Sequence, residues 1–220
     1  MILTFTNRTG GASLGAFASL NLGGHVGDDA ERVAENRKSI ERDFGPIQFM
    51  NQVHGDRIAI VEEVTDLAPE ADALITGIPG VAIAVMVADC IPLILTSKEV
   101  VAAVHVGRKG LANDITRKTI RTMEDMGAGA ITAHIGPAIC GSCYEVSQDI
   151  QNEIVAQHPK AKAKTREGTP SLDLVGGLKA VLIEEGVDIK SRFECTVENL
   201  DLFSYRRDGV TGRQAGIVCL

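Results

Sequence analysis

Three side chains that bind transition metals lie in or just after apolar, strand-like segments of this sequence. His54 and His105 each have a glycine within two residues, and Cys90 is followed closely by Pro92. Strand ends that lead into short turns are places where distant side chains converge. Two imidazoles and one thiolate bind Zn²⁺ well, and an open fourth position lowers the pKa of the bound water to about 7.

Spacing alone leaves a plainer alternative open. The three side chains are 36 and 15 residues apart and match no local zinc motif. Cysteine is among the most buried residue types, so Cys90 also fits a core position with two unrelated histidines nearby in sequence.

The elements that must position these side chains are mostly strands. Strands are expected over residues 2–6, 47–53, 57–64, 71–75, 81–87, 91–96, 100–106, 130–135, 194–197 and 214–220. Helices are expected over residues 30–44, 112–126, 147–157 and 174–185. Strands outnumber helices and do not alternate with them regularly. The pattern therefore favours the α+β class, with mixed β-sheets packed against helices in a single domain over residues 1–220, rather than a doubly wound α/β fold.

Two segments lack this periodicity. Residues 7–29 form a Gly-rich stretch too long for a simple turn, and long ordered loops are often functional. Residues 158–171 are polar and basic, and we expect them to be mobile.

The charge balance of 22 basic and 29 acidic residues gives −7, which argues against a broad nucleic-acid or anionic-membrane surface. Arginines could still bind a small anion locally. No apolar run reaches the roughly 18 residues of a membrane span, and the first residues do not read as a signal peptide. Five cysteines, an odd number, fit reduced thiols. We therefore expect a cytoplasmic protein.

Eight short segments occur in an order that resembles one known family. They are Thr6–Gly11, Ser19–Asp28, Glu35–Arg37, Gln52–Gly55, Ala88–Pro92, His105–Gly107, Gly136–Ile139 and Phe203–Asp208. Together they resemble the YfiH family, also described as laccase-domain proteins or peptidoglycan editing factors. In that family the matching His, Cys and His bind the metal, so the resemblance implies that His54, Cys90 and His105 are the ligands.

One departure from the family concerns the third ligand. The family usually continues His-Ala-Gly-Trp-Arg-Gly, whereas this chain has Arg108 and Lys109 in place of Trp-Arg and contains no tryptophan. Without this tryptophan, the wall of the site beside His105 lacks a large aromatic surface that the family usually has. We therefore expect the substrate preference of this protein to differ from that of other family members.

The resemblance implies a zinc-dependent purine nucleoside phosphorylase. Such an enzyme would cleave adenosine, inosine and methylthioadenosine with phosphate, and would also deaminate adenosine. Its partners would be a purine nucleoside and phosphate. Deamination needs an activated water and a proton shuttle, and phosphorolysis needs a phosphate site, for which guanidinium groups are well suited.

Arginines in the matching segments are the predicted phosphate ligands. We expect Arg37 and one of Arg206 and Arg207 to bind substrate, with ion pairs to Glu35 or Asp208 as the alternative.

Four further polar residues have predicted roles in the site. Asn21 and Gln52 would hydrogen-bond a ribose or base, or else tie down the N-terminal loop. Asp89 would act as a general base or orient a histidine, with backbone capping as the alternative. His25 would shuttle a proton, although a lone loop histidine is more often simply exposed.

Copper is the alternative metal. Two histidines and a cysteine also form the ligand set of a blue-copper centre, with Met86 as an axial ligand, and an older label for the family is polyphenol oxidase. A multicopper enzyme needs many further histidines, and only three would remain. A reduced cytosol with little free copper also favours Zn²⁺ over Cu²⁺.

Two other functions remain open. One is a peptidoglycan-precursor editing amidohydrolase that uses the same activated water. The other is a non-catalytic module, which would need a fourth metal ligand such as Cys140 or His134. The Cys140–Cys143 spacing has no second pair and no βαβ context, so a structural role is expected.

Overall fold

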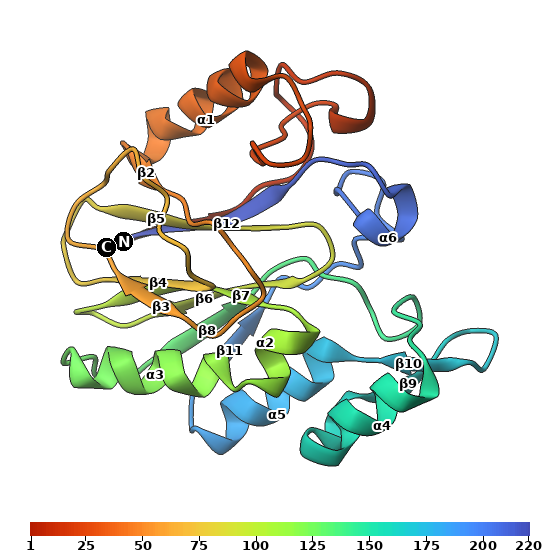
Figure 1. The fold of residues 1–220 in the computed structure, drawn as a ribbon. Coiled ribbons are helices and arrows are strands. Elements are labelled where there is room, and N and C mark those ends of the chain that lie inside the picture. Colours follow the sequence, from red (N-terminus) through yellow and green to blue (C-terminus); the bar gives the residue numbers. More distant parts are fainter.

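The computed structural model describes residues 1–220 as four stacked layers. Figure 1 shows helix α1 above a first sheet, a second sheet below it, and a layer of helices beneath the second sheet. Both sheets contain parallel and antiparallel neighbours, so the predicted α+β class with mixed sheets is confirmed.

The strands divide between the two main sheets and one hairpin. The four-stranded sheet has the order β1 (Ile2–Phe5), β12 (Gln214–Cys219), β5 (Ala82–Val87), β2 (Ile47–Gln48). The six-stranded sheet has the order β11 (Asp188–Ser191), β8 (Thr132–Ile135), β6 (Ile91–Thr96), β7 (Val101–Val106), β4 (Ala73–Thr76), β3 (Ile58–Ile60). Strands β9 (Lys162–Lys164) and β10 (Pro170–Leu172) form the hairpin.

The structure has six helices and two 3₁₀ turns, and most of the helices lie on the outer faces of the two sheets (Figure 1). They are α1 (Ala30–Phe44), α2 (Arg108–Ala112), α3 (Ile115–Asp125), α4 (Gln148–Gln157), α5 (Leu174–Glu184) and the short α6 (Tyr205–Asp208), with 3₁₀ turns η1 (Gly15–Phe17) and η2 (Pro159–Ala161). None of these helices has the length and apolar character needed to cross a membrane.

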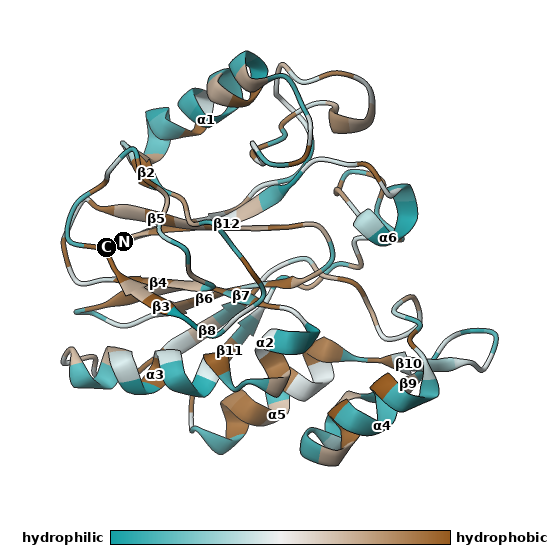
Figure 2. Cartoon of the chain, viewed as in Figure 1, coloured by the Kyte–Doolittle hydropathy of each residue, from teal (hydrophilic) through white to brown (hydrophobic).

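The central strands are apolar on both faces because layers cover both sides. On β5, Ala82, Ala84 and Met86 pack into the core beneath α1, and Ile83, Val85 and Val87 pack into the core between the sheets. Figure 2 shows the same distribution, with hydrophobic strands inside and hydrophilic residues along the outer helices. This burial explains why β5, β6 and β7 read as continuous apolar runs in the sequence.

Several predicted boundaries differ from the structure. The helix predicted over 112–126 corresponds to α3 (Ile115–Asp125), and a separate short helix, α2, precedes it, because Asp114 with a φ of 59° interrupts the helical backbone between them. The strands predicted over 47–53 and 57–64 shorten to β2 and β3, since the residues between them leave one sheet and cross to the other.

Two segments in the C-terminal half have a different structure from the one predicted. Residues 158–171, expected to be mobile, form η2 and the β9–β10 hairpin, which is held by backbone hydrogen bonds. Residues 194–197 form no strand, and only an isolated bridge between Ala138 and Cys195 occurs there. The strand in this region is β11, a polar edge strand that lacks the apolar pattern.

Candidate active site

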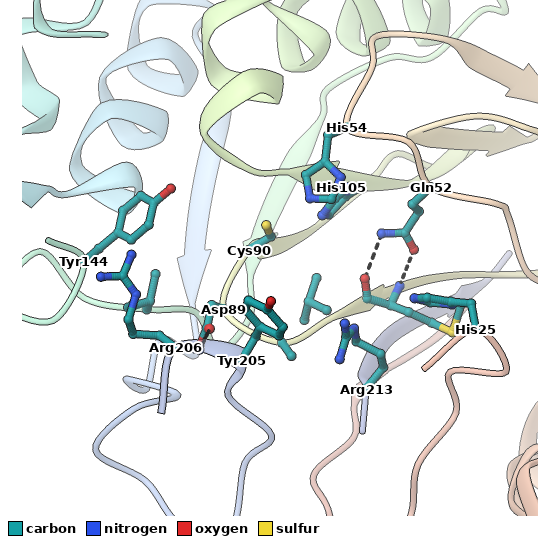
Figure 3. Close-up of a pocket in the computed structure, with 14 residues that line it drawn as sticks. His25, Gln52, His54, Asp89, Cys90, His105, Tyr144, Tyr205, Arg206 and Arg213 are labelled. Carbon is teal, nitrogen blue, oxygen red and sulfur yellow. Dashed lines mark hydrogen bonds between the residues drawn. The ribbon is translucent and has the colours of Figure 1, made fainter. Parts of the chain in front are cut away.

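The three predicted metal ligands meet where the chain crosses between the sheets. His54 lies on the β2–β3 connection and Cys90 on the β5–β6 connection, and both connections pass from the four-stranded to the six-stranded sheet. His105 lies on β7 with its ring on the inter-sheet side, because Val104 and Val106 face the helices. One ligand atom from each residue lies within 4.8 Å of the other two (Figure 3). We call His54, Cys90 and His105 the cavity cluster.

A buried carboxylate that the sequence analysis did not identify holds both histidines. Asp72, just before β4, is fully buried and accepts a 2.8 Å hydrogen bond from Nδ1 of His105. It also accepts from the backbone N–H groups of His54 (3.0 Å) and Gly55 (2.7 Å). Because a carboxylate only accepts, Nδ1 of His105 carries a proton, so Nε2 is the ring nitrogen that would bind a metal ion after losing its own proton. An acidic residue at the start of an apolar strand was the available signal.

The charges within the cavity cluster support a metal-binding thiolate. Burial raises the pKa of the Cys90 thiol, but His105 and His54 outweigh it and lower that pKa to about 6. Burial lowers the pKa of His105, whereas Cys90 and Asp72 raise it to about 9. Burial raises the pKa of Asp72, yet hydrogen bonds from His105 and Gly55 bring it below its ordinary value. Two imidazoles and a thiolate in this arrangement suit a borderline-soft divalent ion.

Close packing at the start of α2 fixes the position of the thiol. A methyl group added at Gly107 would lie 2.9 Å from Sγ of Cys90 and 3.5 Å from Cδ2 of His54. Only glycine leaves room here for the cluster, which gives the His-Val-Gly segment a steric explanation.

The cavity cluster faces a cavity of about 570 Å³. Its other lining residues include His25, Gln52, Asp89, Ile139, Tyr144, Tyr205, Arg206 and Arg213. The volume falls within the range typical of small-molecule sites, and the wall combines aromatic surface with two guanidinium groups. Figure 3 shows the cluster on one side and Arg213 with His25 on another.

Gln52 lines the cavity, but its amide is already paired. Nε2 donates to the backbone oxygen of Met86 at 2.8 Å, and Oε1 accepts from the Met86 N–H at 2.9 Å. Gln52 therefore ties the His54 connection to the end of β5 (Figure 3).

Asp89 anchors the C-terminal segment. It has a φ of 101°, and its carboxylate accepts hydrogen bonds from Thr196 Oγ1 (2.6 Å), Ser204 Oγ (2.7 Å) and the Arg206 N–H (2.6 Å). The carboxylate that orients a histidine is Asp72, which corrects that predicted role for Asp89. A backbone conformation of this kind is costly and is retained where surrounding contacts enforce it.

His25 lines the cavity, and the pKa of its imidazole lies below the ordinary histidine value. Partial burial lowers its pKa, and the guanidinium groups of Arg213 and Arg37 lower it further. The imidazole is therefore neutral near pH 7.

Asn21 and Arg37, which were predicted to bind substrate, do not line the cavity. Asn21 is fully buried, where it donates to Asp28 (2.9 Å) and accepts from the Arg213 N–H (2.8 Å), so it ties down the loop. Arg37 donates twice to the Leu22 carbonyl, at 2.9 and 2.8 Å. The structure thus matches the alternative predicted for Asn21, and the polar groups of both residues are used within the long N-terminal loop.

The neighbouring residues Arg206 and Arg207 have different surroundings in the structure. Arg207 does not line the cavity and donates to the carbonyls of Thr196 (2.8 Å) and Leu202 (2.7 Å). Arg206 lines the cavity and lies 5.3 Å from the ring centroid of Tyr144.

The sequence analysis did not identify Arg213, Tyr144 or Tyr205 as cavity residues. Burial lowers the pKa of Arg213, whose guanidinium donates to two nearby backbone carbonyls. Burial raises the pKa of Tyr144, and Arg108 acts in the opposite direction, so Arg108 lies near this wall. Tyr205 lies in the matching segment Phe203–Asp208, which was the available signal, whereas no sequence pattern separates Tyr144 or Arg213 from ordinary loop residues.

The suggested additional metal ligands lie elsewhere. His134 hydrogen-bonds Thr96 at 3.1 Å, and Cys140 belongs to a different cluster. Sδ of Met86 contacts Arg37 at 3.8 Å, and its side chain packs in the core beneath α1. The structure thus leaves the cavity cluster with three protein ligands and no fourth histidine or cysteine.

Comparisons with solved structures define the class of protein. The fold matches a YfiH protein of Bacillus licheniformis with a TM-score of 0.91 and 31% identity, covering 99% of this chain and 92% of that one. A Neisseria meningitidis protein matches with a TM-score of 0.90 and 37% identity, covering 98% and 92%. The fold is that of the YfiH proteins, as predicted.

Sequence comparison gives the family. The family described as multi-copper polyphenol oxidoreductase laccase matches residues 2–220, and this chain belongs to it. The chain is 44% identical to a purine nucleoside phosphorylase of Corynebacterium glutamicum, covering 98% of this chain and 93% of that protein. It is 35% identical to the purine nucleoside phosphorylase YfiH of Shigella flexneri, covering 98% and 92%.

Proposed function

We propose that this protein is a zinc-dependent purine nucleoside phosphorylase whose metal is held by His54, Cys90 and His105. The observation that carries the proposal is the convergence of these three ligand atoms within 4.8 Å beside a cavity that also contains arginines. The names of the relatives support the same reaction, since several at 35–44% identity are purine nucleoside phosphorylases.

The cavity offers separate surfaces for a base and for an anion. Tyr144, Tyr205 and Ile139 provide flat and apolar surface on which a purine would pack. Arg206 and Arg213 provide guanidinium groups, which pair well with phosphate oxygens. In this proposal the two arginines bind phosphate and neutralise the charge that moves during glycosidic cleavage.

Proton transfer is assigned to His25. Its imidazole is neutral near pH 7 and lines the same cavity, so it can exchange a proton with the base or with water. Asp89 and Gln52 act as positioning residues, because their hydrogen bonds hold the walls that carry Arg206 and Met86. A zinc ion at the cavity cluster would supply a Lewis acid and a water of lowered pKa.

The substrates proposed are adenosine, inosine and methylthioadenosine, with adenosine deamination as a second reaction of the same cavity. Phosphorolysis uses the arginines, and deamination uses the activated water together with His25. The two reactions thus depend on overlapping but unequal sets of residues.

A product assay on adenosine tests the proposal. Protein with a measured zinc content is incubated with adenosine, with and without phosphate, and the products are separated. Adenine and ribose 1-phosphate formed only with phosphate report phosphorolysis, and inosine formed in both reactions reports deamination. His25→Gln is expected to reduce deamination while leaving zinc content unchanged.

Two outcomes would contradict the proposal. Turnover of a UDP-MurNAc-amino acid, without turnover of any purine nucleoside, would assign the site to cell-wall precursor editing. Stoichiometric copper with a blue absorption band would assign it to an oxidase.

A further inference from the structure

A second group of metal-binding side chains lies outside the cavity. Cys140, Cys143, Cys195 and Glu198 each offer one ligand atom, and these four atoms all lie within 4.8 Å of one another. Cys140 and Cys143 lie on the loop after β8, and Cys195 and Glu198 on the loop after β11. We call these four residues the loop cluster. None of the cysteines forms a disulfide.

The backbone holds the loop cluster in the geometry of a metal-binding turn. The Cys143 and Tyr144 N–H groups both donate to the Cys140 carbonyl, at 3.1 and 3.0 Å, which folds the two-residue spacing into a tight turn. The Cys140 N–H donates to Sγ of Cys195 at 3.4 Å, and Sγ of Cys143 lies 3.7 Å from Oε1 of Glu198. Metal ligands in proteins are held by hydrogen bonds of this kind.

The number and type of donors favour a closed site. Structural zinc sites have four protein ligands in tetrahedral arrangement and are rich in thiolates, with Zn–S distances of about 2.3 Å. Three thiols and a carboxylate within 4.8 Å provide that number of ligands, whereas the cavity cluster provides three. Oε1 of Glu198, the oxygen near Sγ of Cys143, also pairs with Arg166, and Oε2 is the other oxygen that Glu198 could offer to a metal ion. We propose that the loop cluster binds a second, structural zinc ion.

The position of the loop cluster gives this ion a role at the cavity. Its two loops are joined by a β-bridge between Ala138 and Cys195. Ile139 and Tyr144, which flank the Cys140–Cys143 turn, line the cavity. Thr196, next to Cys195, donates to Asp89 beside the metal ligand Cys90. A zinc ion in the loop cluster would therefore lock one wall of the cavity in place.

Metal counting on purified full-length protein tests this proposal. Wild-type protein produced with added zinc is expected to contain two zinc ions per chain. The double variant Cys140→Ser/Cys143→Ser is expected to contain one, and Cys90→Ala is expected to contain one. Cys219→Ser is the control, because Cys219 is a free cysteine that belongs to neither cluster, and it should retain two.

A second measurement avoids reliance on variants that fold poorly. Anomalous scattering at the zinc edge from wild-type crystals is expected to give a peak among the three Sγ atoms of the loop cluster. A peak at the cavity cluster alone would overturn the proposal, as would a zinc content in solution that is the same in the Cys140→Ser/Cys143→Ser variant as in the wild type. A Cys140–Cys143 disulfide detected by mass spectrometry in freshly purified protein would also overturn it.

Discussion

The cavity cluster and the loop cluster share cysteine ligands but differ in everything around them. The cavity cluster has three ligands, faces open space and is supported by the buried carboxylate of Asp72. The loop cluster offers four ligand atoms, does not line that cavity and links two loops. The comparison teaches that ligand number and surroundings, rather than cysteine content, separate a reactive centre from a structural one.

The thiols of the two clusters also differ electrostatically in the metal-free protein. His105 and His54 lower the pKa of Cys90 to about 6, despite burial. In the loop cluster, burial and the neighbouring thiols raise the pKa of Cys143, and burial raises that of Cys140. Imidazoles favour the thiolate, whereas neighbouring thiols disfavour it until a cation is present.

The largest expected effect comes from removing a ligand of the cavity cluster. His54→Ala, Cys90→Ala and His105→Ala should each reduce nucleoside cleavage below detection, because each removes a donor from a three-ligand site. The loop-cluster variant Cys140→Ser/Cys143→Ser should retain measurable turnover with a raised KM. Steady-state assays check this, with circular dichroism to establish folding. Near-normal activity in a folded cavity-cluster variant would refute the assignment.

Replacing the supporting carboxylate should have the next largest effect. Asp72→Asn keeps the shape of the side chain but weakens the hydrogen bond from Nδ1 of His105. Loss of such a partner typically costs about 10–100-fold in metal affinity or activity. Zinc competition with a chromogenic chelator measures the affinity. Asp56→Asn, which removes only an exposed ion pair with Lys118, is the control and should behave like wild type.

A smaller effect is expected at Gly107. Gly107→Ala places a methyl group 2.9 Å from Sγ of Cys90, so the thiolate must shift by a few tenths of an ångström. We expect a loss of roughly tenfold in turnover, with zinc still bound, because a small misplacement of this kind can cost up to about 10²-fold. Gly129→Ala is the matched control, since its nearest neighbouring atom is 3.7 Å away. Equal activity of the two variants would show that the thiolate position is unimportant.

The smallest effect is a difference in alkylation rate. In zinc-free protein the Cys90 thiolate forms as pH rises through about 6, whereas an ordinary cysteine requires pH near 9. Iodoacetamide modification of Cys90 should therefore level off near neutral pH, while modification of Cys140 and Cys143 should keep increasing above it. Peptide mass spectrometry at a series of pH values measures each site. A Cys90 rate that follows Cys140 would contradict the assigned electrostatics.

The sequence predicted the buried elements of the fold better than the exposed ones. Strands β5, β6 and β7 are buried at every position and, apart from Thr96 and His105, are apolar, because layers cover both faces; α1 was predicted with its observed bounds. Strand β11 is an exposed edge strand of polar residues, so hydrophobic periodicity could not reveal it. The break between α2 and α3 depends on the backbone of one residue, Asp114.

The sequence predicted some residues of the candidate site and not others. The grouping of His54, Cys90 and His105 followed from motifs that resemble a known family. Asn21 and Arg37 lie in matching motifs too, yet their polar groups are used to order the N-terminal loop. A motif marks residues that the fold requires as well as residues that touch a substrate, and only the packed structure separates the two kinds.

The place of β12 between β1 and β5 sets an order for folding. Strand β1 pairs with β12, where Ile2 lies opposite Cys219. Because these two residues are near opposite ends of the described chain, their pairing closes a loop that contains almost all of it. The β6–β7 hairpin is local and sets Pro92 opposite His105. Local pairing forms faster than distant pairing. We therefore expect the thiolate and one imidazole to come together early in folding, and Arg213, next to β12, to complete the cavity last.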